Sequence, residues 1–106
     1  MTDAAVLQRL AQVIAARRTA DPERSYVARL LAQGEEAVLK KLAEETAETL
    51  LASKEGDKLR IVHETADLWF HSLILLAWHE LGPEDVLAEL RRREGVSGIG
   101  ERQARS

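Results

Sequence analysis

The chain contains no cysteine, which excludes disulfide bonds, thiolate zinc sites and a cysteine nucleophile. It has no P-loop and no G-x-G-x-x-G segment, so the common glycine-rich phosphate cradles are absent. The longest apolar run, residues 73–78, is far too short to cross a bilayer, and the N-terminus lacks a signal-peptide pattern. From these absences we expect a cytoplasmic protein with no membrane partner.

What is present describes a soluble globular chain. Its 106 residues correspond to one domain, with 45% apolar and 31% charged residues. The net charge of −3 argues against nucleic acid as the main partner, because no excess of positive charge offsets the phosphates. A chain this small also gains from dimerisation, which covers apolar helix surface that a single copy leaves in water.

Almost every segment carries a helix signal, and no segment alternates with the period of a strand. The sequence therefore predicts an all-α, single-domain bundle of four to five helices over residues 1–95, followed by a polar, glycine-containing tail at 96–106. Asp3 is the expected cap of the first helix, and Asp21-Pro22-Glu23 is the expected start of the second, which stops at Gly34. The expected later helices span residues 35–55, 57–81 and 83–94.

Five carboxylates lie on one face of two expected helices: Glu44, Glu45, Glu48, Glu64 and Asp67. Like charges four residues apart destabilise a helix by roughly 0.2–0.5 kcal/mol per pair, and a divalent cation would turn that repulsion into ligation. Oxygen ligands alone favour Mg²⁺ or Mn²⁺ over zinc or copper, and Mg²⁺ often shares its site with substrate phosphates. The pattern predicts a metal-dependent enzyme that acts on a phosphorylated compound.

The expected helix over residues 57–81 is apolar nearly all round, which predicts that most of it, including its tryptophans, is buried. Glu64 and Asp67 on that helix then need a partner or a metal. An antiparallel arrangement with the 35–55 helix would bring both acidic faces together. The simpler alternatives are a solvated acidic face supported by lysine pairs, and a packed, hydrogen-bonded His71. His63-Glu64-Thr65-Ala66-Asp67 begins like the H-E-x-x-H zinc motif but ends in aspartate.

The acidic positions also carry a family resemblance. Glu45-x-x-Glu48 and Glu64-x-x-Asp67, with residues 49–63 between them, resemble the signature of the all-α nucleotide pyrophosphohydrolases, often called MazG-like. Within that superfamily the chain is most similar to the phosphoribosyl-ATP pyrophosphatases of histidine biosynthesis. Four segments carry this closer similarity: residues 25–30, 40–45, 64–71 and 95–102.

The resemblance implies hydrolysis of phosphoribosyl-ATP to phosphoribosyl-AMP and pyrophosphate by a homodimer. It implies Mg²⁺, with Mn²⁺ as a possible substitute, which would offset phosphate charge and activate a water molecule. Glu44 and Glu45 are the expected catalytic residues, Glu44 by orienting that water or accepting its proton. The remaining expected roles are Glu45, Glu48, Glu64 and Asp67 as metal ligands, and Lys41, Lys40, Ser25 and Tyr26 in substrate binding.

Two other functions stay open from the sequence. One is a MazG-like enzyme that removes surplus or non-canonical nucleoside triphosphates, which would share the metal site. The other is a non-catalytic helical dimer with an acidic face, for which metal would have no effect on stability. A pyrophosphate-release assay with phosphoribosyl-ATP, ATP and the deoxynucleotides separates these three readings.

Overall fold

The computed structural model describes Asp3 and residues 5–95, and its described part is built from helices without strands. The helices are α1 (Val6–Arg17), α2 (Tyr26–Ala32), α3 (Glu35–Glu55), α4 (Lys58–Trp78) and α5 (Pro83–Arg93). The all-α prediction is confirmed. No helix within the described ranges is both long and apolar enough to cross a membrane.

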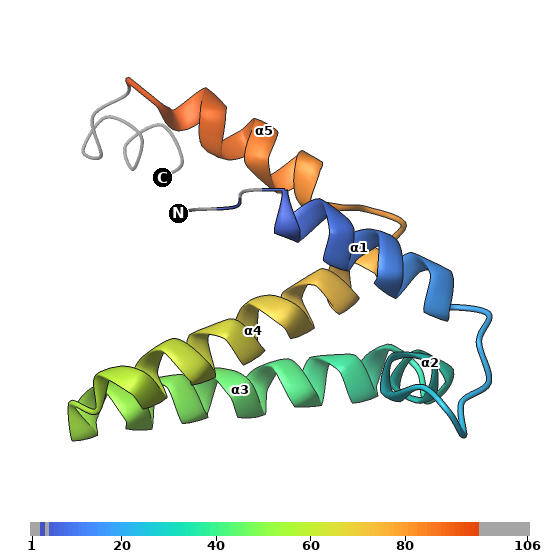
Figure 1. Ribbon diagram of the computed structural model, residues 1–106, viewed down its shortest axis with the longest axis horizontal. Coiled ribbons are helices and arrows are strands. Elements are labelled where there is room, and N and C mark those ends of the chain that lie inside the picture. Colours follow the sequence, from blue (N-terminus) through green and yellow to red (C-terminus); the bar gives the residue numbers. More distant parts are fainter. Residues whose placement is uncertain (1–2, 4, 96–106) are drawn as a thin grey trace.

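The two longest helices, α3 and α4, form an antiparallel hairpin that is the most extensive helix contact of the fold (Figure 1). Gly56 ends α3 with φ 74°, a left-handed conformation that glycine adopts without steric cost. The Asp57 side chain then caps α4 by accepting from the Arg60 amide at 3.2 Å. Both boundaries agree with the sequence prediction, since local capping chemistry defines them.

The other helices pack around this hairpin. Figure 1 shows α1 and α5 on the side of α4 away from α3, and α2 beside the first turns of α3. Ile14 of α1, Val38 of α3 and Ile74 of α4 are the largest fully buried side chains. The core cluster also contains Val27 and Leu30 of α2, so it lies where four helices meet, at the N-terminal end of α3 and the C-terminal end of α4.

The predicted end of α4 near residue 81 is wrong, because the helix ends at Trp78. Glu80 turns the chain with φ 60°, and the Leu81 amide donates to the Leu76 carbonyl at 2.8 Å. This is the closure of a Schellman motif, which satisfies a terminal carbonyl and usually has glycine in the left-handed position. The sequence showed a breaker only at Gly82-Pro83, so the earlier stop at a glutamate was missed.

Two predicted helix starts also need correction. Asp21-Pro22-Glu23 forms a turn rather than the first turn of α2, with the Asp21 carboxylate accepting from the Glu23 amide at 2.9 Å. The cap of α2 is Ser25, whose hydroxyl oxygen accepts from the Ala28 amide at 3.1 Å. Asp3 accepts from the Ala5 amide at 3.2 Å and so stands before the N-cap position of α1, which Ala5 occupies.

The expectation of a largely buried α4 is wrong for the single chain. Its C-terminal half is packed, with Leu73 and Ile74 buried, but Leu59, Val62 and Trp69 are 86%, 68% and 59% exposed. Trp69 is therefore not a core residue here. The N-terminal half of α4 has α3 along only one side, which leaves apolar side chains in water.

Candidate functional site

The carboxylates of α4 lie together with a histidine. His63, Glu64 and Asp67 each offer a ligand atom, and these atoms lie within 4.8 Å of one another. The His63 Nε2 atom is 3.4 Å from Asp67 Oδ2. Positions three and four residues apart share a helix face, and Glu64 and His63 precede Asp67 by these spacings, so α4 alone builds this cluster. The sequence reasoning missed His63, although its i, i+4 spacing to Asp67 was the available signal.

The carboxylates at the middle of α3 are arranged around a lysine. The Lys41 ammonium is 3.6 Å from Glu45 and 3.8 Å from Glu44. Glu45 is buried at 8% exposure, whereas Glu44 is exposed. The pKa of Lys41 is raised, chiefly by the negative charge that Tyr26 carries once it ionises at high pH and also by Glu45 and Glu44. The buried Glu45 charge thus has the cationic partner that burial requires.

Glu48 is held by the opposite helix. Its carboxylate accepts from the Arg60 guanidinium of α4 at 3.1 Å, and Arg60 also pairs with Glu55. Hydrogen bonding to Glu55, followed by its charge, raises the pKa of Arg60, so the guanidinium remains charged. The four expected ligands are therefore divided. Glu64 and Asp67 lie together, while Glu45 and Glu48 each contact a basic side chain.

One side-chain contact nevertheless shows that α3 and α4 lie close together beside these acidic residues. The Thr49 hydroxyl of α3 donates to the Glu45 carbonyl of its own helix at 2.8 Å and also lies 3.3 Å from the Glu64 carbonyl oxygen of α4. Thr49 directly follows Glu48, so the turn of α3 that carries Glu48 packs beside the turn of α4 that carries Glu64. The antiparallel pairing of α3 and α4 is confirmed, whereas the gathering of the four carboxylates around one metal stays a prediction.

The expected substrate residues lie on two helices. The Ser25 hydroxyl oxygen caps α2, and the Tyr26 hydroxyl lies 2.8 Å from Nε2 of the buried His71. Lys40 is exposed on α3, one position before Lys41. His71 is packed and hydrogen-bonded, as the simpler reading expected, and Tyr26 reaches it from a helix distant in sequence.

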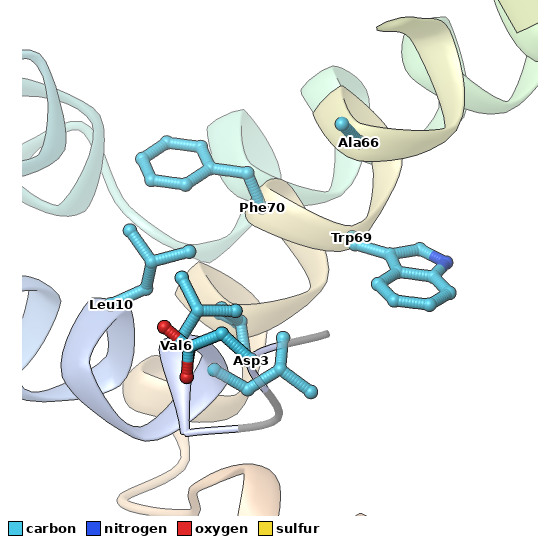
Figure 2. A pocket seen from close by; sticks show the side chains of 8 residues that line it. Asp3, Val6, Leu10, Ala66, Trp69 and Phe70 are labelled. Atoms are coloured by element: carbon cyan, nitrogen blue, oxygen red, sulfur yellow. The ribbon is translucent and has the colours of Figure 1, made fainter. Parts of the chain in front are cut away.

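The apolar hollows of the molecule lie away from this polar site. One, of about 270 Å³, lies between α1 and α4; Figure 2 shows Val6 and Leu10 on one side and Ala66, Trp69 and Phe70 on the other. A groove of about 390 Å³ continues from Trp69 along α4 to α5. Among the residues that the structure describes, Asp3 is the only charged one lining the first hollow and none lines the groove, so these linings offer a phosphate no cation.

The fold and the donor set together define a small helical domain with an oxygen-rich site of the kind that suits a hard cation. A family model described as phosphoribosyl-ATP pyrophosphohydrolase matches residues 7–94. The chain therefore belongs to the phosphoribosyl-ATP pyrophosphohydrolase family, and the resemblance read from its motifs is confirmed.

Curated relatives named phosphoribosyl-ATP pyrophosphatase match nearly the whole chain. The protein from Nitrosospira multiformis is 62% identical over 105 residues, covering 99% of this chain and 87% of the relative. That from Nitrosomonas eutropha is 59% identical over 101 residues, covering 95% and 86%. The relative from Aromatoleum aromaticum is 55% identical over 106 residues, covering 100% and 98%.

Proposed function

We propose that the chain hydrolyses phosphoribosyl-ATP to phosphoribosyl-AMP and pyrophosphate in histidine biosynthesis. The family match over residues 7–94, with relatives named for this enzyme, is the observation that carries the proposal. The acidic turns of α3 and α4 that pack beside each other supply a site with the required chemistry. A biosynthetic role of this kind also supports a cytoplasmic location.

The donor set fits a divalent metal. Glu45, Glu48, Glu64 and Asp67 would hold Mg²⁺, with Mn²⁺ as a substitute, because all four offer carboxylate oxygens. When bound, the metal would offset negative charge on the substrate phosphates and activate the attacking water. Glu48 would exchange part of its Arg60 contact for the cation. His63, beside Asp67, is a nitrogen donor that suits Mn²⁺ better than Mg²⁺.

The remaining residues would orient the reactants. Exposed Glu44 would position the attacking water or accept its proton, beside Glu45, and Lys41 would offset charge on the triphosphate. Lys40, exposed on the next position of α3, is a second cation for that chain of phosphates. Ser25 keeps its hydroxyl proton free to donate, because its oxygen serves the helix cap as an acceptor.

A homodimer is the assembly we propose. Leu59, Val62 and Trp69 on α4 are exposed, and the groove between α4 and α5 adds the apolar side chains of Val86 and Leu87. Apolar surface that is continuous over two helices marks an association site in a soluble protein. A second copy of this chain meets that surface with the same apolar residues.

A pyrophosphate-release assay tests the function. Phosphoribosyl-ATP should be hydrolysed far faster than ATP or any deoxynucleotide, and excess EDTA should abolish the activity. Removing residues 96–106, which lie outside the described structure, should narrow the preference for phosphoribosyl-ATP. Equal or faster hydrolysis of a free triphosphate such as dCTP or dUTP would replace this proposal with the nucleotide-cleansing function. Full activity in EDTA would refute the metal site.

A further inference from the structure

His71 has no role in the proposed chemistry, yet its two ring nitrogens are both engaged. Nδ1 is 2.8 Å from the Asp67 carbonyl oxygen, and Nε2 is 2.8 Å from the Tyr26 hydroxyl. A carbonyl oxygen only accepts, so the proton of the neutral ring belongs on Nδ1. Nε2 is then the acceptor, and the Tyr26 hydroxyl donates to it.

Close packing also restrains the side chains of His71 and Tyr26. The His71 side chain is buried at 5% exposure. The Phe70 ring stands at 88° to the imidazole with centroids 5.5 Å apart, and the Tyr26 ring stands at 81° at 5.7 Å. Edge-to-face contacts of this kind restrict the rotation of both rings. The imidazole is therefore held in one orientation on α4, and the side chain of Tyr26, the first residue of α2, is hydrogen-bonded to it.

Tyr26 in turn lies beside the polar side of α3. The charges of Lys41 and Glu45 both act on its phenol, while burial is the main reason that its pKa is raised. The Arg29 guanidinium lies 5.8 Å from the centre of its ring. A raised pKa keeps the hydroxyl protonated at neutral pH, as a donor to His71 must be. The Tyr26 ring thus contacts the imidazole of α4 and the guanidinium of α2, and the charge of Lys41 on α3 reaches its hydroxyl.

We propose that His71 is a positioning residue: by accepting the Tyr26 hydroxyl proton it holds the Tyr26 ring and the start of α2 beside Lys41. This inference rests on the proposed function, in which Lys41 meets the triphosphate. It changes the role expected for Tyr26. The hydroxyl is committed to His71, so the partly exposed ring, rather than the hydroxyl, forms the substrate-facing wall.

The chain allows a matched set of variants. Tyr26→Phe removes the donor and keeps the ring. His71→Asn keeps a donor near the Nδ1 position but removes the acceptor, whereas His71→Gln keeps an acceptor near the Nε2 position. Ser72→Ala is the control, since it removes a hydrogen bond to the Leu68 carbonyl within α4 and leaves α2 untouched.

We expect Tyr26→Phe and His71→Asn each to raise KM for phosphoribosyl-ATP about fivefold, the factor that corresponds to ~1 kcal/mol, with a smaller change in kcat. The double variant should be no worse than either single one, because both remove the same contact. His71→Gln should recover part of the loss, and Ser72→Ala should behave as the wild type. Losses that multiply in the double variant would overturn the positioning role.

Long-range proton–nitrogen NMR of the imidazole gives a readout independent of activity. The wild type should show a protonated Nδ1 and an unprotonated Nε2, and Tyr26→Phe should shift the Nε2 signal while Ser72→Ala should not. A protonated Nε2, or a signal indifferent to Tyr26→Phe, would overturn the proposal. A wild type that shows this tautomer but does not hydrolyse phosphoribosyl-ATP would refute the proposed function instead.

Discussion

Two faces of α4 differ in almost every property. One face carries Glu64, Asp67 and His71, packs beside the acidic turns of α3, and is rich in hydrogen bonds and ion pairs. The other carries Trp69 and Leu76, lines the groove toward α5, and has apolar side chains open to solvent. One helix thus separates a polar surface suited to phosphate chemistry from an apolar surface suited to association.

The difference explains why α4 looks apolar nearly all round in sequence. In the proposed homodimer, a helix with the reaction site on one side and a second copy on the other would have no side left for solvent. Apart from Lys58 in the first turn, its charged residues Arg60, Glu64 and Asp67 share one side of the helix. The separation predicts that substitutions on one face affect activity and those on the other affect assembly.

The largest expected effect comes from the polar face. Asp67→Asn should lower kcat/KM for phosphoribosyl-ATP by ~10²-fold or more, the size found when an electrostatic group at a reaction site is removed. Stability without metal should change little, because relief from Glu64 offsets the lost His63 contact. The assay is pyrophosphate release, with Glu36→Gln, an exposed acid at the start of α3, as the control. Wild-type turnover by Asp67→Asn would remove this residue from the site.

The effect of added Mg²⁺ on stability tests the polar face of α4 in a second way. A ligand that binds only the folded state stabilises it by ~2.7 kcal/mol at a concentration one hundredfold above its Kd. Mg²⁺ at such a concentration should raise the Tm of the wild type and raise that of Asp67→Asn much less. Thermal unfolding with Mg²⁺ and with EDTA measures both. Identical Tm values for the wild type in the two buffers would favour the non-catalytic helical dimer.

A charged side chain introduced on the apolar face of α4 tests the proposed homodimer. Trp69→Lys should weaken the homodimer by about a hundredfold, because a buried aromatic anchor contributes ~2 kcal/mol or more and the lysine would have to be desolvated. Light scattering across a dilution series measures the change. Gln8→Lys, which adds the same charge at an exposed polar position of α1, should leave the dimer intact. A wild type that is monomeric at micromolar concentration would refute the assembly.

The smallest expected effect is on the stability contributed by Glu89 of α5, which belongs to neither face of α4. Hydrogen bonds from Arg92 and Arg93 lower the pKa of Glu89 on α5 from 4.5 to about 2. A lowered folded-state pKa means stability that is present above pH 4.5 and is lost as the pH falls toward 2. Glu89→Gln should therefore lower the Tm slightly at neutral pH, and the difference should shrink in acid. A difference that grows on acidification would contradict this pairing.

The helix boundaries show which features of the fold could be predicted from the local sequence. The end of α3 at Gly56 and the start of α4 after Asp57 were predictable, since each depends on one residue and its own turn. The end of α4 was not, because Glu80 takes a left-handed conformation that favours glycine. Asp21 was misplaced because it stabilises a turn with the chemistry that elsewhere caps a helix.

The sequence by itself determined the all-α class, because helix spacing and capping act between residues a few places apart, and its motifs carried the resemblance to the family. Only the tertiary structure decided which basic side chain meets which acid, such as Arg60 with Glu48. It also decided that Tyr26 meets His71, 45 residues away, and that Trp69 stays exposed. These outcomes depend on how helices cross and which faces they cover, and that geometry is set by the packing of many side chains together.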